Sequence, residues 1–348
     1  MKLLITGGAG FIGSAVVRRA LDRGLSVVTL DALTYSGSLE NLAEVRDQPS
    51  HAFERADITD ASAVAAILDK HQPDAILNLA AESHVDRSID GPLAFMHTNV
   101  TGTAVLLEAA RRYWQALPGD RVERFRFQHI STDEVFGSLE PGDAAFDEDS
   151  RYQPNSPYAA SKAGSDMLVR AWRETYGLPT LLTNCSNNYG PRQHPEKLIP
   201  TVILNAAAGR PIPVYGQGTN IRDWLHVDDH AEALLTVLEQ GRVGETYGVG
   251  GEAERTNIDL VRLICAELDR LRPAGAPHDR LIQFVTDRPG HDRRYAIDIS
   301  KIERDLGWRP ATELEDGIAA TVAWYLDNPS WIDSWRARGF GGERLGLG

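Results

Sequence analysis

The feature that most constrains the fold is a glycine-rich turn at the start of the chain, between a short apolar run and a helical stretch. Its glycines are Gly7, Gly10 and Gly13, with the apolar run at residues 2–6 and the helical pattern at residues 14–23. Glycines at these places allow a tight turn, close approach of the backbone to a pyrophosphate, and close packing of helix on strand. The helix N-terminus also favours negative charge. This segment therefore predicts a strand, turn and helix that bind a dinucleotide.

Apolar β runs alternate with helix-length segments through the first half of the chain. We predict strands at residues 2–6, 26–30, 52–55, 75–79, 125–130 and 180–184, and helices at 14–23, 61–70, 93–114 and 156–176. Strands that alternate with helices form parallel, doubly wound sheets. We therefore expect an α/β fold with a doubly wound parallel sheet of the Rossmann type. Ligands of such folds bind beyond the carboxyl ends of the strands.

The alternation fades after residue 189, where five prolines fall between residues 191 and 213. A chain of 348 residues exceeds the usual size of a single domain. We expect residues 1–189 to form a dinucleotide-binding domain that carries the catalytic residues. Residues 190–340 should form mainly a smaller C-terminal substrate-binding lobe, with some segments returning to the sheet. The last ten residues, 339–348, are expected to be frayed.

Charge and composition exclude several classes of partner. The formal net charge of −13 argues against nonspecific binding to nucleic acid and to an anionic membrane surface. No apolar stretch reaches the roughly 18 residues of a membrane span, and the N-terminus lacks the pattern of a signal peptide. The two cysteines are too few for a disulfide framework or a cysteine-rich metal site and fit a reducing compartment. We expect a cytoplasmic protein with no nucleic-acid or membrane partner.

Asp31 stands at the end of the second β run. This is near the roughly 20-residue offset expected for a carboxylate that binds the adenosine ribose of a dinucleotide. Because a carboxylate there would repel a 2′-phosphate, the sequence favours NAD over NADP as the cofactor. The glycine spacing departs from the usual G-x-G-x-x-G, and taken alone it also fits a loop glycine cluster beside a solvated aspartate.

Tyr158 and Lys162 are four residues apart on the predicted helix 156–176, so they share one face. A nearby ammonium favours phenolate over phenol, and we expect it to lower the pKa of the tyrosine toward that of a base. The same spacing taken alone also fits an exposed aromatic beside a surface lysine.

Thr132, Asp133 and Glu134 follow the β run 125–130, which would place them at the carboxyl edge of the sheet. Two neighbouring carboxyl groups can hold opposite protonation states because like charges raise one pKa. A tyrosine that takes a proton from an alcohol, followed by such an acid and base, predicts a redox-assisted elimination. The alternative for the two carboxylates by themselves is a polar loop exposed to water.

A phosphorylated substrate needs local positive charge in this acidic protein. Lys197, Arg222 and Arg288 are candidates because they lie in loops bounded by Pro and Gly, although solvated surface cations are the alternative. His226 and His230 have helical spacing but lack the Glu of a His-Glu-x-x-His metal site. We therefore predict no metal there, only a turn into a helix.

Several motifs resemble those of the extended short-chain dehydrogenases/reductases: Gly7-x-x-Gly10-x-x-Gly13, Asn78-Leu-Ala-Ala81 and Tyr158-x-x-x-Lys162. Within that superfamily, the segments 81–89, 131–137, 187–191 and 195–200 are similar to those of the dTDP-glucose 4,6-dehydratases, and the match spans most of the chain. The chain departs from the family at Phe136, where tyrosine is usual, and at Arg192-Gln193-His194, where the family segment is more aromatic.

The resemblance implies a lyase that uses bound NAD to convert dTDP-glucose into dTDP-4-keto-6-deoxy-glucose, a step of deoxysugar and surface-polysaccharide biosynthesis such as that of dTDP-rhamnose. In this reaction Tyr158 takes the C4 hydroxyl proton while hydride passes to NAD, with Lys162 holding the phenolate and Thr132 hydrogen-bonding the oxygen. Glu134 then takes the C5 proton, and Asp133 protonates the departing C6 hydroxyl. The hydride returns to C6.

The resemblance also implies the remaining site residues. Those expected to bind the cofactor are Gly7, Gly10, Phe11, Ile12, Gly13, Asp31, Leu33, Thr34, Asp57, Ile58, Leu79, Ala80, Ala81, Ser83, Thr98, Tyr158, Lys162 and Asn188. Those expected to bind the dTDP-sugar substrate are Ser83, Thr132, Asn187, Lys197, Leu198, Pro213, Tyr215, Arg222, Asn257, Arg288 and His291. The helix 93–114 is of the type that mediates dimers in the superfamily, so we expect a homodimer.

Other functions remain open at this point. Another nucleotide-sugar 4,6-dehydratase, an epimerase or a decarboxylase would keep the glycines, Tyr158 and Lys162, although an epimerase or decarboxylase is not expected to carry the acidic pair after Thr132. From a different class, a noncatalytic NAD-binding regulator typically loses Tyr or Lys of the pair, and both remain in this sequence.

Overall fold

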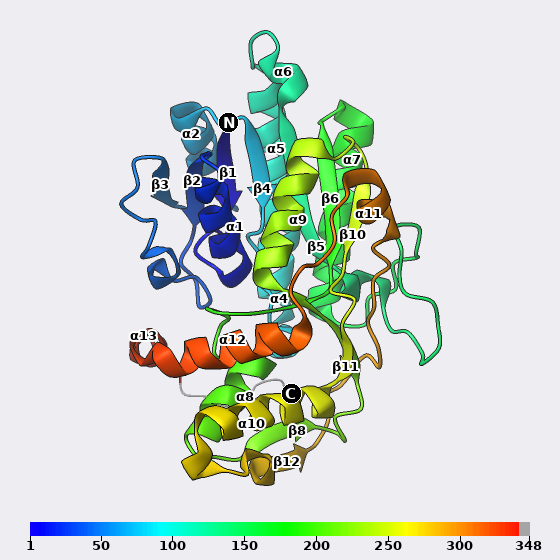
Figure 1. Cartoon of the computed structure of the whole chain (residues 1–348). Coiled ribbons are helices and arrows are strands. Elements are labelled where there is room, and N and C mark those ends of the chain that lie inside the picture. Colours follow the sequence, from blue (N-terminus) through cyan, green and yellow to red (C-terminus); the bar gives the residue numbers. More distant parts are fainter. Residues whose placement is uncertain (341–348) are drawn as a thin grey trace.

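Seven parallel strands form the central sheet of the protein (Figure 1), in a computed structural model that describes residues 1–340. In spatial order the strands are β3 (His51–Arg55), β2 (Ser26–Asp31), β1 (Lys2–Thr6), β4 (Ala75–Asn78), β5 (Arg126–Thr132), β6 (Thr180–Cys185) and β10 (Thr246–Val249). The order reverses between β1 and β4, the switch point where doubly wound sheets bind ligands. The predicted α/β fold with a doubly wound parallel sheet is confirmed.

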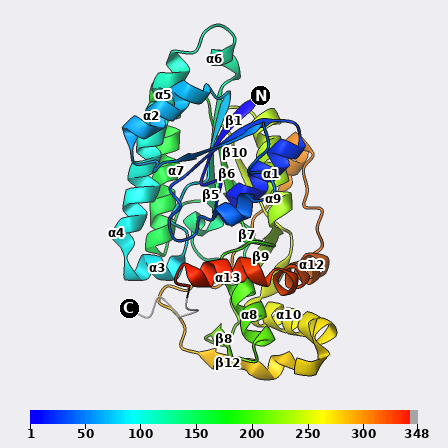
Figure 2. The same ribbon diagram turned by 90° about the vertical axis from the view of Figure 1, so that its left-hand side faces the viewer.

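Helices cover both faces of this sheet. Leu3 and Ile5 pack toward one helical layer and Leu4 toward the other, because successive residues of a strand point to opposite sides. The first layer contains α1 (Phe11–Asp22), α9 (Val227–Gln240) and α11 (Ser300–Leu306), and the second contains α2 (Ala61–His71), α5 (Thr103–Gln115) and α7 (Pro157–Tyr176) (Figures 1 and 2). Strands buried on both faces read as continuous apolar runs, which is why the sequence revealed them.

Helix α7 begins and ends with standard capping signals. The side chain of Ser156 accepts a hydrogen bond from the backbone N–H of Ala159 at 3.1 Å, and Pro157 occupies the first turn, where its missing N–H costs nothing. The helix ends at Gly177, which adopts the left-handed conformation with φ of 73°. These signals fix the position of the two residues of the predicted Tyr-Lys pair near the start of the helix.

The predicted helix 93–114 is helical throughout but is not one α-helix. It consists of α4 (Pro92–Phe95), a π-helical segment η2 (Met96–Gly102) and α5, and it is preceded by α3 (Val85–Asp90). Single π-helical turns inside helices are frequent at functional sites, and periodicity in the sequence does not announce them. Together with α7 these segments line one side of the molecule (Figure 2).

The second half of the chain builds a smaller lobe below the carboxyl edge of the sheet (Figure 1). Its strands are β7 (Asn187–Tyr189), β8 (Ile212–Tyr215), β9 (Ile221–His226), β11 (Glu254–Thr256) and β12 (Ile282–Val285), and its helices are α8 (Leu198–Ala207), α10 (Asn257–Leu271), α12 (Leu314–Asp327) and α13 (Pro329–Ala337). The strands form a three-stranded sheet in the order β11-β9-β7 and a two-stranded parallel sheet of β8 and β12. A separate apolar core joins α8, α10, α12 and α13.

Helix α13 returns from the lobe to the first domain, close to the segment after β2. Its Trp331 donates a hydrogen bond from Nε1 to Oδ1 of Asn41 at 2.9 Å, and Arg338 just beyond the helix donates to the carbonyl of Gly37 at 2.7 Å. Of the segment 339–348, residues 341–348 lie outside the described residues. Among residues 1–340, no helix has the length and apolarity needed to cross a bilayer.

Candidate active site

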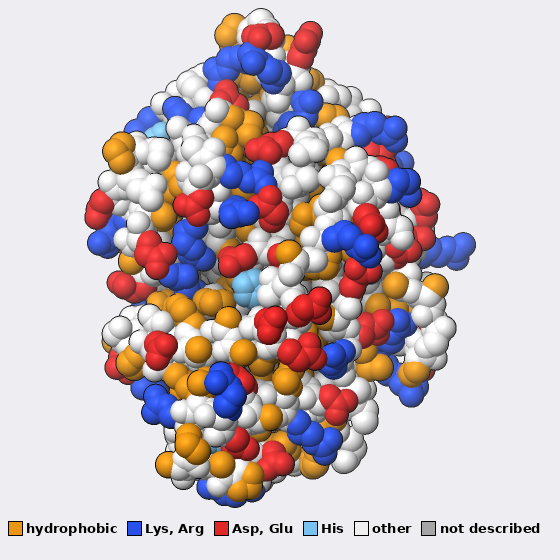
Figure 3. Space-filling model, viewed as in Figure 1, with side chains coloured by type: hydrophobic (Ala, Val, Ile, Leu, Met, Phe, Trp, Pro, Cys, Tyr) orange, Lys and Arg blue, Asp and Glu red, His pale blue; other side chains and the backbone are white. Residues whose placement is uncertain are grey.

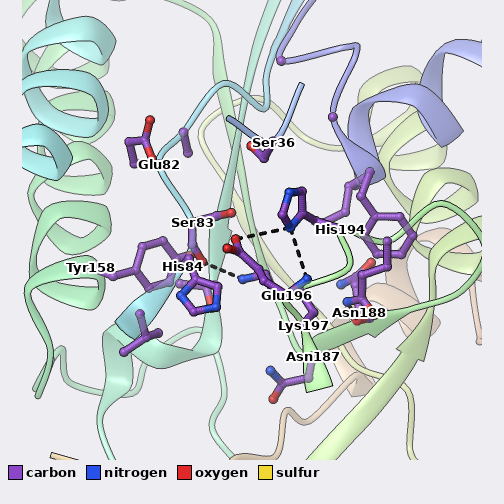
Figure 4. A pocket seen from close by; sticks show the side chains of 18 of the residues that line it. Ser36, Glu82, Ser83, His84, Tyr158, Asn187, Asn188, His194, Glu196 and Lys197 are labelled. Carbon is purple, nitrogen blue, oxygen red and sulfur yellow. Dashed lines mark hydrogen bonds and ion pairs between the residues drawn. The ribbon is translucent and has the colours of Figure 1, made fainter. Parts of the chain in front are cut away.

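A cavity of about 460 Å3 extends from the glycine turn after β1 to the inner side of the lobe. It lies beyond the carboxyl ends of the parallel strands, where the fold predicts a ligand. Its walls come from the turns after β1, β2, β4, β5 and β6 and from the lobe segments around α8, β8 and β9. Figure 4 shows part of it, with Tyr158 on one side and His194, Glu196 and Lys197 facing it from the lobe.

The glycine turn leaves room that side chains would fill. A Cβ on Gly7, whose φ is 66°, would come within 2.7 Å of the backbone nitrogen of Ala80, and a Cβ on Gly13 would collide with the carbonyl oxygen of Gly7. Gly10 precedes α1 and offers no side chain to cap it. The first backbone N–H groups of a helix have no partner within the helix, and Phe11 at its start lines the cavity. This turn therefore fits a pyrophosphate.

Asp31 lines the cavity at the end of β2 and also holds the glycine turn in place. Its Oδ2 accepts a hydrogen bond from the backbone N–H of Ala9 at 2.9 Å, and its Oδ1 accepts one from Leu33 at 2.8 Å. Burial raises the pKa of this carboxyl, although the two backbone hydrogen bonds oppose the shift. The alternative of a solvated aspartate is therefore wrong, since Asp31 is only 8% exposed.

The structure gathers all but one of the residues that we expected to bind the cofactor. Those that line the cavity are Gly7, Gly10, Phe11, Ile12, Gly13, Asp31, Thr34, Asp57, Ile58, Leu79, Ala80, Ala81, Ser83, Thr98, Tyr158, Lys162 and Asn188. Leu33 is the exception, since it does not line the cavity, and its contact with the cofactor stays a prediction. It packs against the apolar core under α1, while its neighbours Ala32 and Thr34 reach the cavity. Its positive φ of 54° turns the chain at this point.

Thr132, Asp133 and Glu134 lie where β5 passes into a short 3-10 helix, η3 (Asp133–Phe136). The hydroxyl of Thr132 donates to Oδ1 of Asp133 at 3.2 Å and accepts from the backbone N–H of Glu134 at 3.3 Å. Thr132 and Glu134 line the cavity, whereas Asp133, 1% exposed, lies immediately behind its wall. The alternative of a polar loop exposed to water is therefore wrong.

Both carboxyl groups are shifted toward the protonated form. Burial, and then the charges of Glu134 and Asp223, raise the pKa of Asp133 well above its usual range. Burial also raises the pKa of Glu134, but Arg288, Arg222 and other cations oppose that shift. The neighbouring cations thus favour ionisation of Glu134, while Asp133 has fewer opposing charges. This difference fits one acid and one base.

Tyr158 does not behave as predicted from its spacing to Lys162. Burial raises the pKa of the Tyr158 phenol well above its usual range, and the charges of Glu134, Cys185 and Asp133 raise it further. The prediction of a lowered pKa is therefore wrong for the chain alone, because the carboxylates and the lack of solvent outweigh the ammonium. A hydrogen bond with Thr132 opposes the shift.

Lys162 is held by the end of β5 and by a buried network behind it. Its ammonium donates a hydrogen bond to the carbonyl of Ile130 at 2.7 Å. Asn78 donates from Nδ2 to Nδ1 of His129 at 3.1 Å, so the ring proton of the neutral imidazole lies on Nε2, which is 3.2 Å from Oδ1 of Asp166. Burial, with the charge of Lys162, lowers the pKa of His129 to about 4. Asp166 is thus the buried carboxyl group nearest this network, and it favours the charged form of Lys162.

Three cations face the cavity from the lobe. Lys197 donates to the carbonyl of Ser83 at 2.9 Å, Arg222 donates to the carbonyl of Asp292 at 2.9 Å, and Arg288 pairs with Asp86 at 3.2 Å. Burial lowers the pKa of Lys197 and of Arg222. These residues are not solvated surface cations, so that alternative is wrong. Figure 4 shows Lys197 reaching toward Ser83.

Every residue that we expected to bind the substrate lines this cavity. They are Ser83, Thr132, Asn187, Lys197, Leu198, Pro213, Tyr215, Arg222, Asn257, Arg288 and His291. Oδ1 of Asn187 and Oδ1 of Asn257 are buried and have no hydrogen-bond partner within the described chain. Buried polar atoms without a partner are costly, and a bound polar ligand would satisfy them.

Sequence reasoning missed a further group of polar residues in the cavity. They are Tyr35, Ser36, Glu82, His84, Asp86, Ser131, Gln193, His194, Glu196 and Tyr295. Several of these stand inside the segments 81–89, 131–137 and 195–200 that carried the resemblance, so a closer inspection of those segments could have found them. Tyr35 and Tyr295 carry no such signal, because only the fold brings their loops to the cavity.

His226 and His230 lie at the turn from β9 into α9, as predicted. The ring of His226 accepts a hydrogen bond from the backbone N–H of Asp228 at 3.3 Å and caps the helix. Nδ1 of His230 lies 2.8 Å from Oδ1 of Asn188. Residues 1–340 contain no cluster of His, Cys, Asp and Glu side chains suited to a metal ion.

Known proteins are similar to this chain in sequence and in fold. A family model described as GDP-mannose 4,6 dehydratase matches residues 4–321. The dTDP-glucose 4,6-dehydratase of Shigella flexneri is 58% identical over 343 residues, covering 96% of this chain and 95% of that protein. The enzyme of the same name from Xanthomonas campestris pv. campestris (strain B100) is 59% identical over 346 residues, covering 99% of this chain and 98% of that protein.

Solved structures agree with the sequence comparisons. DesIV, a dTDP-glucose 4,6-dehydratase from Streptomyces venezuelae solved with NAD and TYD bound, superposes with a TM-score of 0.88 and 46% identity, covering 96% of this chain and all of that one. A UDP-glucose 4-epimerase from Thermotoga maritima has a TM-score of 0.83 but only 28% identity, with coverage of 94% and 100%. This chain therefore belongs to the sugar-nucleotide dehydratase family described by the matching model, the family of the dTDP-glucose 4,6-dehydratases.

Proposed function

We propose that this chain is a lyase that uses NAD to dehydrate dTDP-glucose to dTDP-4-keto-6-deoxy-glucose. The observation that carries the proposal is the placement of Thr132, Asp133 and Glu134 beside Tyr158 at the cavity that begins at the glycine turn. The relatives named dTDP-glucose 4,6-dehydratase support the choice of substrate, and DesIV was solved with NAD and TYD bound.

The residues around the glycine turn fit NAD. Gly7, Gly10 and Gly13 leave space for the pyrophosphate, the uncapped start of α1 favours its charge, and the Asp31 carboxylate suits a ribose with a free 2′-hydroxyl. When bound, NAD supplies the redox chemistry by taking a hydride from C4 of the sugar and returning it to C6.

Tyr158 takes the proton of the C4 hydroxyl while C4 is oxidised. The oxygen that results is held by the Tyr158–Thr132 pair, whose hydrogen bond favours the phenolate. Lys162, fixed on Ile130 and accompanied by Asp166, supplies positive charge on the same helix face. The ketone at C4 makes the C5 hydrogen acidic.

Glu134 then takes the proton from C5, and Asp133 delivers a proton to the C6 hydroxyl that leaves as water. When the hydride returns to C6, the proton on Glu134 returns to C5. The cations near Glu134 favour its ionised form, whereas the burial of Asp133 favours its protonated form. Removal of water across C5 and C6 requires one carboxylate as base and one carboxylic acid as proton donor.

The nucleotide part of the substrate lies against the lobe. Lys197, Arg222 and Arg288 provide positive charge for the diphosphate, and arginine suits two-point contact with phosphate oxygens. Pro213 and Tyr215, at β8, cover the base. In this division of labour residues 1–189 bind NAD and carry the catalytic groups, and residues 190–340 mainly bind the sugar nucleotide, although β10 and α9 belong to the sheet domain.

We propose further that the chain forms a homodimer and acts in the cytoplasm. Leu93 on α4 is 80% exposed and Met167 on α7 is 51% exposed, and both helices lie on the same side of the molecule (Figure 2). Apolar side chains that stand out from neighbouring helices favour association with a second copy. On the face drawn in Figure 3, by contrast, acidic and basic side chains are interspersed.

Incubation of the purified chain with dTDP-glucose, UDP-glucose and GDP-mannose, each analysed by mass spectrometry and NMR, tests the proposal. We expect dTDP-glucose to lose one water and to give the 4-keto-6-deoxy sugar at the highest rate. A C4 epimer of dTDP-glucose would indicate an epimerase. Faster dehydration of UDP-glucose or GDP-mannose would show that this other sugar nucleotide is the preferred substrate. A chain that binds NAD and leaves all three sugars unchanged would be a noncatalytic binding protein.

A further inference from the structure

One buried carboxylate of the sheet domain contacts two of the lobe residues that face the nucleotide. Asp86 lies on α3 and is 5% exposed. Its Oδ2 accepts a hydrogen bond from the hydroxyl of Tyr215 at 2.9 Å, and its Oδ1 accepts one from Nη1 of Arg288 at 3.2 Å. One side chain thus joins α3 to two separate segments of the lobe.

The two lobe residues come from the ends of a pair of strands. In the parallel pairing of β8 and β12, Tyr215 lies opposite Val285, and Arg288 follows in the next turn of the chain. Their side chains therefore enter the cavity from the same edge of the lobe. Without an anchor, a long arginine side chain on such a loop would sample many rotamers and lose that freedom on binding.

The contacts of Arg288 leave part of its guanidinium for a ligand. Asp86 takes Nη1, whereas Nε is buried and has no hydrogen-bond partner within the described chain. Arginine has five N–H donors in a fixed planar fork, so an anchor at one end orients the rest. Buried donors without a partner are unfavourable unless a ligand satisfies them. The free side of this guanidinium suits an oxygen of a diphosphate.

Direct contact between Asp86 and the diphosphate would be repulsive, because both are anionic. Paired with Arg288, the carboxylate instead acts on the substrate through its two neighbours. We propose that Asp86 is a positioning residue that holds Arg288 toward the diphosphate and Tyr215 toward the base, so that the nucleoside diphosphate is recognised as one unit by both domains. This inference rests on the proposed function and specifies how its substrate is bound.

The test compares Asp86→Asn with the wild type, using the full chain with NAD. The amide keeps a hydrogen-bond acceptor but loses the charge that pairs with Arg288. We expect the KM for dTDP-glucose and the Kd for dTDP to rise about tenfold, since the charge that strengthens the hydrogen bond from Arg288 is lost. The kcat should stay within about threefold, because the reacting atoms are not touched. Asp86→Glu, which keeps the charge, should restore part of the affinity.

Glu44→Gln is the matched control. Glu44 also accepts a hydrogen bond from an arginine of the second half of the chain, Arg192 at 2.6 Å, but neither residue lines the cavity. Its loss should leave KM and the Kd for dTDP unchanged. If Asp86 only held the two domains together, Asp86→Asn would have the KM and the Kd for dTDP of the Glu44→Gln control, with at most a lower Tm.

The inference is overturned if folded Asp86→Asn binds dTDP and dTDP-glucose as the wild type does. If Asp86→Asn does not fold, Tyr215→Phe serves as the test variant. It removes the hydrogen bond from Tyr215 to Asp86 and keeps the Asp86–Arg288 pair. An unchanged Kd for dTDP in Tyr215→Phe would then contradict the inference. A wild type that binds dTDP without dehydrating dTDP-glucose would refute the proposed function, while the Kd measurements would still test Asp86.

Discussion

The hydroxyl of Thr132 donates a hydrogen bond to Oδ1 of Asp133 at 3.2 Å, which leaves Oδ2 of the same carboxyl buried and without a partner in the described chain. A buried carboxylate needs several hydrogen bonds or a cation to remain ionised. Asp133 has one hydrogen bond, from Thr132, and the charges of Glu134 and Asp223 raise its pKa more than the charge of Arg222 lowers it. This arrangement favours a protonated Asp133, the form that can donate a proton.

The dependence of thermal stability on pH should reveal whether Asp133 is protonated in the folded chain. Because the pKa of Asp133 is raised in the folded chain, the folded state binds more protons than the unfolded state at pH values between the ordinary and the raised pKa. Stability therefore falls as pH rises through that window. Asp133→Asn removes this loss, so its Tm relative to wild type should increase as pH rises above the ordinary pKa of an aspartate. Thermal unfolding at several pH values measures the difference.

Asp47→Asn is the control for that measurement, because the Asp47 side chain is 88% exposed and should show no such trend. If the wild type instead gains stability relative to Asp133→Asn as pH rises, Asp133 is ionised in the folded chain and cannot be the acid.

Glu134→Gln should stop the elimination and leave the first oxidation intact. The amide cannot take the C5 proton, and the loss of a general base typically lowers a rate by about 10²–10⁴-fold. On mixing with dTDP-glucose, reduced nicotinamide should accumulate, and exchange of the C5 hydrogen with solvent should be lost. Glu140→Gln, a change at a side chain that is 65% exposed, should behave as wild type. Dehydration by Glu134→Gln at the wild-type rate would show that another group is the base.

Thr132→Val should shift the dependence of the rate on pH. The hydrogen bond with Thr132 lowers the pKa of Tyr158, so its removal raises that pKa further. The phenolate then forms only at higher pH, and the rising limb of kcat/KM should move to higher pH, with activity about tenfold lower near neutral pH. Thr132→Ser keeps the hydroxyl and should keep the profile. Equal profiles for the Val and Ser variants would mean that Thr132 does not act on Tyr158.

Leu93→Glu and Met167→Glu should each convert the proposed dimer into monomers. Each variant replaces an exposed apolar side chain of α4 or α7 with a charged one, which would have to be buried between the two subunits. Phe284→Glu is the control, since Phe284 is 49% exposed but belongs to β12 of the lobe. Light scattering after size exclusion gives the mass of each variant. A wild type that is already monomeric at micromolar concentration would contradict the homodimer.

The fold could be predicted where one signal dominated. Strands β1, β2, β4, β5 and β6 are buried on both faces, so each reads as an apolar run with a glycine or polar turn behind it. The lobe gave no such signal, because β7 and β11 have three residues each and their partners are distant in sequence. The π-helical segment η2 buries Asn99 and Gly102, and no apolar pattern in its sequence distinguishes it from the helices on either side.

The sequence indicated which residues would lie near one another in the site, but not the protonation states of their side chains. The pKa of Tyr158 depends on burial and on two carboxylates, and the network behind Lys162 joins β4, β5 and α7. Asp86 and Arg288 are 202 residues apart and meet only through the fold. Leu33 has a positive φ of 54° and packs against the core under α1, while Ala32 and Thr34 line the cavity.

The most direct measurement follows one hydrogen atom. The purified chain is incubated with dTDP-glucose that carries deuterium at C4, and the position of the label in the product is read by NMR and mass spectrometry. If the C4 hydride returns to C6 while Tyr158, Asp133 and Glu134 move only protons, the product is a 4-keto-6-deoxy sugar that has lost water and carries the deuterium on C6. Recovery of unchanged dTDP-glucose, of its C4 epimer, or of a dehydrated product whose C6 lacks the label would contradict this return of the hydride.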